Sequence, residues 1–535
     1  MIQHNIMDNS LKINFSLSQE WLNEKECVVF GVFEGEELPC GLGFKKETVE
    51  KEAGKLFPIF AKIKKHFSHG DFKAKLGELA VLYPSDIVYK RIILCGLGEK
   101  EKLTAEGLRQ AASSAINAAE QLNANRISFT LFGAPTQTAE ERLRYIFEGA
   151  SLGSYKFYGY KSKPESEERK AKNELKEIEF LLPEIIEAGD AEKYQNDLTR
   201  HIIMSEAVYF ARDLTNQPAS VVTPTFIVET AEKLSKEIKG VEFRSFGAKE
   251  LAEMGMGGIL EVGKGSAHEP RMAVLTYCSP DSPQTDLKEN KAFDAVIVGK
   301  GVSFDSGGIS LKPSEKMDEM KMDMAGAAAV LGAFFAIAKM GLPVNIAAVA
   351  PIVENMPGRN AYRPGDIIKT ASGKTIEVLS TDAEGRIILA DALHYAVSQF
   401  KPKYVVDLAT LTGACVVALG HHYAGLFSDD DELSDLLTKA GDETGEKLWA
   451  MPFDECYKKQ IESDIADVKN VGSGGRKGDA VSAAMFLKEF VGGHKGYAHI
   501  DIAGTAMLPE RQGYKTKGGS GFGARLLVEF IKNLK

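Results

Sequence analysis

The chain has 535 residues, more than one ordinary domain holds, and this length favours two domains. Hydrophobic residues make up 44% and charged residues 26% of the chain, as in a soluble globular protein with a large core. The net charge of −10 argues against nucleic acid as the main partner.

No secretory signal is evident, and no apolar run approaches the roughly 18 residues of a membrane helix, so we expect a cytoplasmic protein without a membrane span. The six cysteines are scattered, with no Cys-x-x-Cys pair. That pattern argues against a zinc ribbon or a disulfide framework, and it suits a reducing compartment.

The first part of the chain alternates strand and helix patterns. Short apolar runs predict strands at residues 27–33, 91–95, 126–132 and 178–182. Residues 104–122 have helical spacing, with Thr104 as the expected N-cap. This order predicts an N-terminal α/β domain over residues 1–187 with a partly parallel sheet.

The second predicted domain spans residues 188–535. It starts with a linking helix at 188–214, which ends before Asn216-Gln217-Pro218. Strands are predicted at 294–298, 344–350, 375–379, 404–408 and 497–502, and helices at 324–340, 479–491 and 523–534. Because these strands are mostly apolar runs rather than alternating ones, we predict a larger α/β domain with a mostly buried central mixed sheet flanked by helices.

Charged side chains gather in three segments beside predicted strand ends or helix starts: Lys300, Asp305 and Lys312, then Asp323, then Asp382, Glu384 and Arg386. Each has an ordinary alternative explanation. Residues 299–301 fit a plain turn, Asp323 fits a charge that complements a helix N-terminus, and Thr381-x-x-Glu384 fits a capping box.

The four carboxylates are harder to explain together. Gathered without cations, they would repel one another and could not all stay ionised. No histidine lies in the three segments, so the ligands would be mainly oxygen, which suits Mg²⁺, Mn²⁺ or carboxylate-bound Zn²⁺. Four carboxylates are more than one ion usually needs, and they suit two ions with one carboxylate bridging them.

Other catalytic motifs fail on inspection. The segment at 299–301 lacks the third glycine of a dinucleotide loop, and neither a P-loop nor a Gly-x-Ser-x-Gly elbow occurs. His421-His422 has no His-Glu-x-x-His context, which favours a loop or core-edge role. Cys415 has the neighbours of a small core residue rather than of a nucleophile.

The same segments resemble the leucyl aminopeptidases, the M17 dinuclear metallopeptidases. The resemblance rests on six stretches across the second domain: Ala211–Asn216, Val298–Gly308, Lys321–Ala328, Ser380–Ile387, Ser463–Asp467 and His499–Gly504. In the first domain it is only architectural. Two positions depart from the family pattern, since Ser380 replaces the usual Asn and Ile387 the usual Leu.

The resemblance implies a role for each matching residue. Two divalent metal ions, Mn²⁺ or Zn²⁺ with Mg²⁺ as a third candidate, would be bound by Lys300, Asp305, Asp323, Asp382 and Glu384. Lys312 would stabilise the oxyanion, and Arg386 would hold a bicarbonate ion that relays the proton. The substrate pocket would be lined by Met320, Thr410, Gly413, Ala503 and Met507.

The resemblance also implies the activity and assembly. The expected enzyme removes an N-terminal residue, preferably Leu or another bulky apolar one, from short peptides by means of a metal-activated water. A homohexamer is expected with it, in which residues 1–187 have an oligomerisation or regulatory role and residues 188–535 form the catalytic domain. Two alternatives stay open at this point: a non-catalytic or moonlighting DNA-binding regulator on the same fold, and a two-metal phosphoesterase.

Overall fold

The computed structural model describes residues 12–16, 24–36, 72–85, 88–160, 175–181, 190–280, 293–475 and 477–534. It divides into two compact units: Met1–Ser205 with Glu510–Thr516, and Glu206–Pro509 with Lys517–Lys535. The boundary expected between residues 187 and 188 lies outside the described residues. The division between the units falls within one helix, α5 (Asp190–Asn216), which ends just before Gln217-Pro218.

The first unit contains a six-stranded sheet in the order β1-β6-β5-β2-β4-β3. Its strands are parallel except β3, which is antiparallel to β4. The strands are β1 (Lys12–Ser16), β2 (Val28–Val32), β3 (Leu79–Leu82), β4 (Ile92–Gly96), β5 (Arg126–Thr130) and β6 (Glu177–Leu181).

Two helices, α2 (Ala105–Gln121) and α3 (Ala139–Ser154), pack on each other, and a short 3₁₀ turn, η2 (Lys100–Lys102), precedes them. The Thr104 hydroxyl accepts a hydrogen bond from Gly107 N at 3.1 Å, which confirms the predicted N-cap. The helix α3 has no counterpart among the predicted elements, although Thr138 and Glu141 form a capping box at its start.

The second unit is built on a nine-stranded mixed sheet in the order β16-β15-β18-β14-β9-β11-β8-β7, with β10 paired to β11. Neighbours β9, β11, β14 and β18 are parallel. β8 runs antiparallel to β11 and β7, and β15 runs antiparallel to β18 but parallel to β16. The strands are β7 (Val241–Phe246), β8 (Arg271–Cys278), β9 (Ala295–Gly299), β10 (Gly301–Asp305), β11 (Asn345–Asn355), β14 (Tyr404–Ala409), β15 (Ala424–Ser428), β16 (Leu448–Ala450) and β18 (Tyr497–Asp501).

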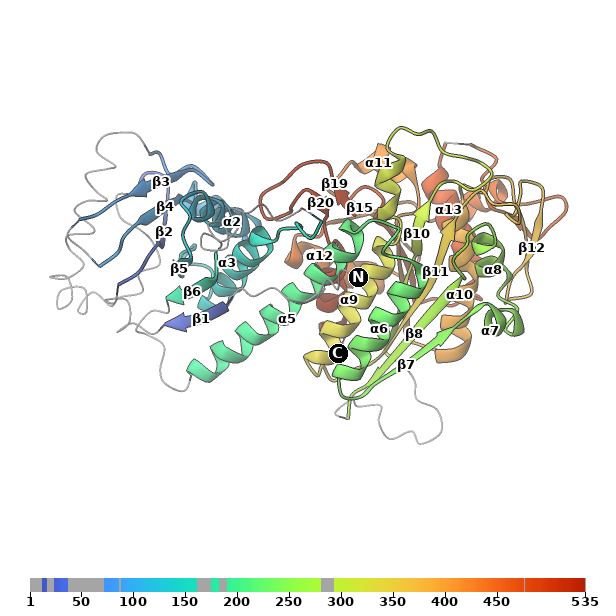
Figure 1. Ribbon diagram of the computed structural model, residues 1–535, viewed down its shortest axis with the longest axis horizontal. Helices are drawn as coiled ribbons and strands as arrows, with labels where there is room; N and C mark the ends of the chain where they lie inside the picture. The colour runs from blue at the N-terminus through green and yellow to red at the C-terminus, as the bar shows by residue number, and fades with distance from the viewer. Residues whose placement is uncertain are drawn as a thin grey trace. The chain divides into compact units, whose positions relative to one another are not determined.

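Helices cover both faces of this sheet (Figure 1). On one face α10 (Glu384–Phe400) packs against α8 (Gly257–Gly263) and α13 (Asp479–Lys488), and on the other α9 (Ala325–Lys339) packs against α6 (Pro224–Glu237) and α14 (Ala524–Lys532). The remaining helices are α7 (Ala248–Glu253), α11 (Gly413–Leu419), α12 (Asp431–Thr444) and the 3₁₀ helices η3 (Met317–Met322) and η4 (Glu455–Gln460). The expected fold, an α/β protein with a buried mixed sheet in its larger part, is confirmed.

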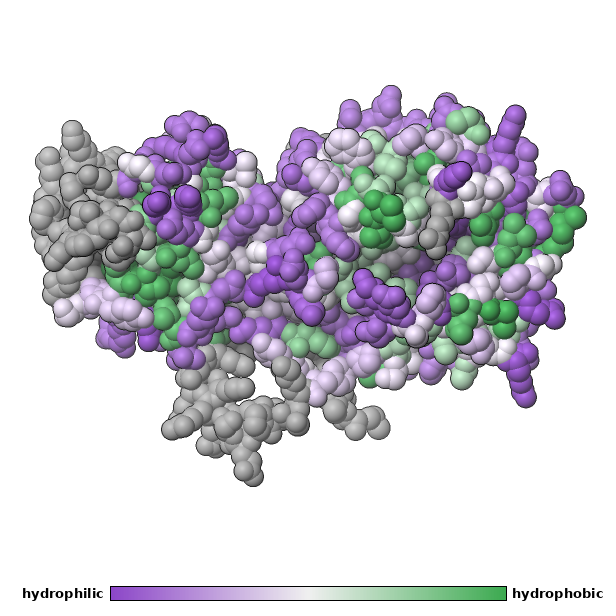
Figure 2. Space-filling view, turned by 90° about the horizontal axis from the view of Figure 1, so that it is seen from above, coloured by the Kyte–Doolittle hydropathy of each residue, from purple (hydrophilic) through white to green (hydrophobic). Residues whose placement is uncertain are grey.

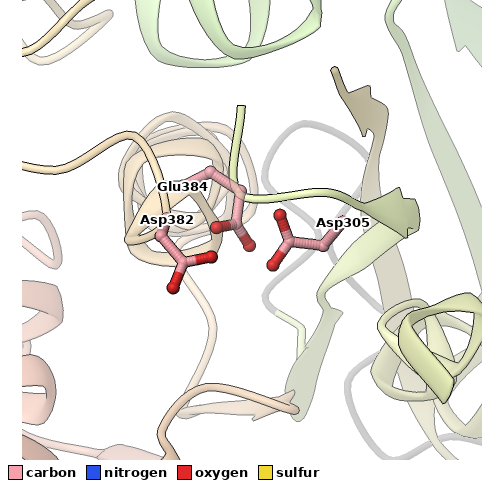
Figure 3. A group of neighbouring side chains, drawn as sticks. All are labelled: Asp305, Asp382 and Glu384. Carbon is pink, nitrogen blue, oxygen red and sulfur yellow. The ribbon is translucent and has the colours of Figure 1, made fainter. Parts of the chain in front are cut away.

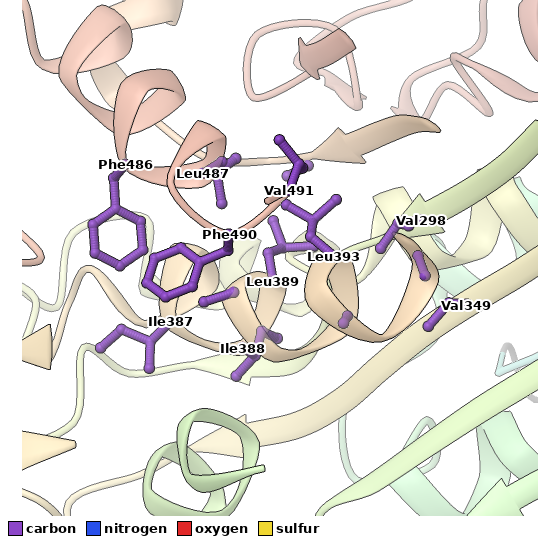
Figure 4. Close-up of a cluster of buried hydrophobic side chains, with 14 of the residues drawn as sticks. Val298, Val349, Ile387, Ile388, Leu389, Leu393, Phe486, Leu487, Phe490 and Val491 are labelled. Atoms are coloured by element: carbon purple, nitrogen blue, oxygen red, sulfur yellow. The ribbon is translucent and has the colours of Figure 1, made fainter. Parts of the chain in front are cut away.

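The apolar face of α10 anchors the core of the second unit. Ile387, Ile388, Leu389 and Leu393 are fully buried and face side chains of α13 and of the central strands. Figure 4 shows these residues beside Phe486, Leu487, Phe490, Val491, Val298 and Val349. This packing fixes the start of α10, where Glu384 is the first residue of the helix.

One prediction about the sheet is wrong. The strand expected at 375–379 is only β13 (Thr375–Glu377), and it belongs to a separate three-stranded sheet with β12 (Ile367–Lys369) and β17 (Val468–Lys469). An apolar run indicates a strand but does not say which sheet it joins. A further small sheet pairs β19 (Met507–Leu508) with β20 (Gly518–Gly519).

The expectation that no apolar segment is long enough for a membrane helix also needs correction. Among the described helices, the segment Met317–Lys339 is long and apolar enough, by length and composition alone, to cross a membrane. However, 83% of its most apolar window is buried inside the protein, because α9 packs between the sheet, α6 and α14. On the face drawn in Figure 2, hydrophilic and hydrophobic residues are interspersed.

Candidate active site

The site begins where parallel strands of the central sheet end. Lys300 directly follows β9, and Thr410 directly follows β14, the parallel neighbour of β9. The Lys300 backbone N donates to Leu408 O at 3.0 Å, and its Nζ donates to Thr410 O at 2.8 Å. The carboxyl ends of adjacent parallel strands are where α/β sheets usually place their ligand sites.

Asp305 is the last residue of β10 and is 3% exposed. Its Oδ1 accepts hydrogen bonds from Gly307 N at 2.9 Å and from Asn355 Nδ2 at 2.8 Å. Its Oδ2 forms an ion pair with Lys312 Nζ at 2.7 Å. Gly307 has a φ of +86°, a backbone conformation that favours glycine, so the turn after Asp305 depends on this residue.

Asp305 meets two acids from another segment of the chain. Carboxylate oxygens of Asp305, Asp382 and Glu384 all lie within 4.8 Å of one another. Figure 3 shows the three side chains converging, with Asp305 arriving from its strand and the other two from the loop and first turn of α10. Asp305 and Glu384 are buried, whereas the Asp382 side chain is 39% exposed and marks the open side of the cluster.

Lys300 connects this group to the fourth acid. Its Nζ lies 2.8 Å from Asp323 Oδ1 and 3.0 Å from Glu384 Oε1. Thr410 Oγ1 also donates to Asp323 Oδ1, at 2.7 Å. Gly385 makes room for the lysine, since a Cβ there would lie 2.4 Å from Lys300 Cε and 2.7 Å from its Nζ. The four carboxylates predicted from sequence are therefore brought together.

Two of the ordinary explanations are wrong. The N-cap of α10 is Ala383, and no side chain caps that helix, so Thr381 and Glu384 do not form a capping box. The Thr381 hydroxyl instead donates to Gly307 O at 2.6 Å and accepts from Ser310 N at 2.7 Å, which ties the two acid-bearing loops together. Asp323 precedes α9 by two residues, and its side chain pairs with Lys300 rather than with the helix start.

Charge in the cluster is unbalanced. If every group is ionised, four carboxylates face the two ammonium groups of Lys300 and Lys312, a net charge of 2 − 4 = −2. Burial raises the pKa of Asp305 and Asp323, and the nearby Glu384 raises both further. Burial alone would lower the pKa of Lys300, but attraction to the surrounding carboxylates outweighs it and raises that pKa.

The oxygens of the cluster fit metal ions. Among the described residues, Asp323 Oδ2 and Glu384 Oε2 are buried and have no hydrogen-bond partner. A buried carboxylate oxygen left without a partner is costly, and such groups are usually paired or bound to a metal. Excess negative charge and two unpartnered oxygens are both relieved by divalent cations, so the residues present fit the expected two-metal centre.

Arg386 lies two residues after Glu384 in the first turn of α10 and is 4% exposed. Its Nη1 donates to Asn470 O at 2.9 Å, and its Nη2 is 3.5 Å from Asp479 Oδ1. Its Nε is buried without a partner among the described residues. Lys312 is 22% exposed and bridges Asp305 to Asp382, with 2.5 Å between its Nζ and Asp382 Oδ1.

The five predicted substrate-pocket residues lie at different distances from the acids. Thr410 contacts the cluster directly. The carbonyl of Met320, a half-buried residue of η3, accepts from Asp323 N at 3.3 Å. Gly413 starts α11, and a Cβ added there would meet no described atom within 4 Å. Ala503 N and Leu411 N both donate to Asp501 Oδ1, and the partly buried Met507 lies in β19.

Sequence reasoning missed two buried asparagines that hold the site together. Asn355 Nδ2 donates both to Asp305 Oδ1 and, at 2.9 Å, to Thr381 O. Asn470 accepts from Leu379 N at 2.8 Å and donates to Ser380 O at 2.6 Å, while its carbonyl binds Arg386. Neither has a signal in a single sequence, because their partners are 26 to 91 positions away.

Comparison with known proteins places these residues in a family. Residues 209–528 match the catalytic domain of the cytosol aminopeptidase family, and residues 29–164 match its N-terminal domain. A probable cytosol aminopeptidase of Roseiflexus castenholzii is 43% identical over 468 residues, covering 87% of this chain and 91% of the relative. One of Chlorobaculum tepidum is 41% identical over 504 residues, covering 91% and 95%.

Solved structures are also similar to this chain over nearly its whole length. The bottromycin maturation enzyme BotP in complex with Mn has a TM-score of 0.79 and 31% identity, covering 95% of this chain and 99% of its own. A mutant tomato leucine aminopeptidase has a TM-score of 0.80 and 29% identity, covering 97% and 96%. The convergent carboxylates and these likenesses over nearly the whole length lead to one conclusion. The chain belongs to the cytosol aminopeptidase family and is an aminopeptidase.

Proposed function

We propose that the chain removes the N-terminal residue of short peptides, with a preference for Leu and other bulky apolar residues, at a centre of two divalent metal ions. The observation that carries this proposal is the convergence of three carboxylates within 4.8 Å, beside two buried carboxylate oxygens that have no described partner. When bound, two such cations would supply an activated water nucleophile and polarise the scissile carbonyl.

Each acid has a place around the proposed centre. Asp305 and Glu384 lie between the other acids and would touch both ions. Asp323 would bind a metal ion on the buried side of the cluster, near Lys300. Asp382 would bind one on the open side through its side chain and its backbone carbonyl. Lys300 Nζ would be a ligand only after losing its proton, which neighbouring cations favour. Oxygen-rich ligands support Mn²⁺ or Zn²⁺, with Mg²⁺ as a third candidate.

The positively charged side chains of Lys312 and Arg386 have distinct proposed roles. Attraction to Asp305 and its neighbours outweighs burial and raises the pKa of Lys312, so its ammonium persists at the open side of the cluster. There it would stabilise the negative oxygen that develops as the peptide carbonyl is attacked. Arg386 keeps its buried Nε as an uncommitted donor, which supports a small anion such as bicarbonate as the proton-relaying base.

The decisive test is hydrolysis of leucine p-nitroanilide and a dipeptide series with Mn²⁺, Zn²⁺, Mg²⁺ or a chelator. Turnover with at least one metal and loss with the chelator are expected. Absence of activity with every metal would contradict the proposal. Hydrolysis of p-nitrophenyl phosphate alone would favour a phosphoesterase, and salt-dependent binding of duplex DNA by an inert protein would favour a regulator.

A companion variant separates chemistry from folding. Glu384→Ala should lose bound metal and activity yet keep its circular dichroism and cooperative unfolding, since Glu384 caps no helix. Unfolding of the variant would instead assign Glu384 a structural role. The homohexamer and the cytoplasmic location stay predictions, and light scattering of the purified chain checks the first.

A further inference from the structure

A pocket lies at one edge of the central sheet, and none of the metal-cluster residues lines it. It has a volume of about 300 Å³ and lies between the edge strand β7, its neighbour β8 and the last turn of α10. Figure 1 shows β7 and β8 at the margin of the catalytic unit's sheet. We call it the edge pocket and define it by Glu242, Arg244, Thr276, Phe293, Tyr395 and Phe400.

The floor of the edge pocket is aromatic. The rings of Phe293 and Phe400 meet edge to face with centroids 4.9 Å apart, and the rings of Tyr395 and Phe400 do so at 5.9 Å. Phe293 and Phe400 are each 8% exposed, and Val274 beside them is 3% exposed. Such a floor binds an apolar side chain by the same burial that drives core packing.

The rim of the edge pocket carries opposite charges. Glu242 and Arg244 are two residues apart on β7, so their side chains lie on one face, and they pair with Thr276 and Val274 of β8. Among the described residues, neither forms a hydrogen bond or ion pair, even with the other. By contrast, Arg271 on the adjoining strand pairs with Glu269 at 2.7 Å.

Edge strands often carry charges simply to discourage pairing with another chain. That explanation accounts for the exposure of Glu242 and Arg244 but not for a cavity with an aromatic floor beneath them. A few convergent polar groups over an apolar floor are the usual composition of a small-molecule site. The carbonyls of the last turn of α10 add partial negative charge near Gln399 and Phe400, on the same side of the pocket.

We propose that the edge pocket binds a free α-amino acid with a bulky apolar side chain. Arg244 would bind its carboxylate, Glu242 and the end of α10 would bind its ammonium group, and the aromatic floor would take the side chain. This ligand belongs to the same chemical class as the products of the proposed reaction. The binding itself rests on the pocket alone and requires neither metal nor turnover.

The test is isothermal titration calorimetry of the full chain, stripped of metal by chelation, with L-leucine. Leucine should bind one site per chain, whereas leucinamide, which lacks the carboxylate, and 4-methylpentanoate, which lacks the ammonium group, should bind at least ten-fold more weakly. Arg244→Gln and Glu242→Gln should each weaken leucine about ten-fold or more, the usual effect of losing a charge-assisted bond. Arg244→Lys should retain part of the affinity.

Control variants assign the binding to the edge pocket. Lys249→Gln with Glu253→Gln neutralises an exposed pair on the nearby α7 and should leave leucine binding unchanged. Asp305→Asn with Glu384→Gln should also leave it unchanged. Binding abolished by the latter pair, or unaffected by the Arg244 and Glu242 variants, would overturn the proposal. If the metal-loaded parent chain binds leucine but does not hydrolyse leucine p-nitroanilide, the result counts only against the proposed function.

Discussion

At the scale of single residues, the site depends on buried groups that are each held from several sides. Lys300 Nζ has three oxygen neighbours from three segments, and Asp305 accepts two hydrogen bonds while pairing with Lys312. The charged members could be predicted from the sequence, because acids and lysines beside strand ends stand out and resemble known motifs. The neutral residues that orient them could not be predicted, because nothing in the sequence distinguishes these asparagines from asparagines in other loops or strands.

Asn355 gives the first prediction. Its amide donates to Asp305 Oδ1 and to Thr381 O, so it fixes two acid-bearing loops relative to each other. Asn355→Ala should lower metal affinity about 10- to 100-fold, the usual effect of removing a group that orients a metal ligand. Competition with a fluorescent chelator measures this affinity, and kcat should recover at high metal concentration.

A matched control lies on the same strand. Asn345, at the other end of β11, is 1% exposed and far along the strand from the acids. Asn345→Ala should cost stability but leave metal affinity unchanged. Equal loss of metal affinity in both variants would mean that Asn355 acts only through the stability of β11, and the orienting role would then be wrong.

At the scale of elements, local sequence patterns predicted the positions of helices better than they predicted side-chain contacts or strand pairing. The spacing that predicts α2, α9 and α14 is a property of consecutive residues, and these three helices form within two residues of the expected bounds. The capping box failed because Thr381 is used by a tertiary contact with Gly307 and Ser310. The strand at 375–377 joined a small sheet because sheet membership depends on β17, about 90 residues away.

Gly385 gives the second prediction. Alanine favours a helix interior by about 1 kcal/mol over glycine, so Gly385→Ala in the first turn of α10 should be neutral or stabilising by propensity alone. A Cβ at this position would, however, lie 2.4 Å from Lys300 Cε and displace that side chain. We therefore expect at least ten-fold lower kcat/KM on leucine p-nitroanilide, with the helix intact by circular dichroism.

Gly107→Ala is the control for this substitution. Gly107 lies in the first turn of α2, where the nearest atom to a new Cβ is the end of the Leu103 side chain at 3.1 Å. A flexible side chain can move, so this variant should keep full activity. Normal activity of Gly385→Ala would show that Lys300 does not need its observed position.

Asp391 gives the third prediction, which concerns how α10 is joined to α8. Its Oδ1 accepts from Ala371 N at 2.8 Å and its Oδ2 from Ile259 N at 3.1 Å, and the side chain is fully buried. Burial raises the pKa of Asp391 to about 7. Between pH 4 and 7 the folded chain therefore holds a proton that the unfolded chain has lost, so stability falls as pH rises.

The difference between an ordinary carboxyl pKa and a pKa of about 7 corresponds to at most about 4 kcal/mol. Urea unfolding at pH 5 and pH 8 should show a smaller pH-dependent loss of stability in Asp391→Asn than in the parent chain. Asp366→Asn is the control, because hydrogen bonds from Arg363 outweigh burial and lower the pKa of Asp366. That group is ionised throughout the tested range. Identical pH dependence of the parent and Asp391→Asn would contradict the prediction.

At the scale of the whole molecule, the chain forms two compact units with separate cores. All five proposed metal-binding residues lie in the unit Glu206–Pro509 with Lys517–Lys535. The other unit has its own six-stranded sheet and none of these residues. The two-part organisation could be expected from length alone, whereas the return of Glu510–Thr516 to the first unit has no signal in the sequence.

Metal binding should therefore stabilise one unit and not the other. An ion that binds only the folded state adds RT ln(1 + [L]/Kd), about 4 kcal/mol at a thousand-fold excess over Kd. Differential scanning calorimetry with Mn²⁺ and with a chelator should resolve two transitions, of which only one moves with metal. Asp305→Asn with Glu384→Gln should abolish this shift while leaving the other transition in place. An equal shift of both transitions would contradict the assignment, because the proposed ligands all come from one core.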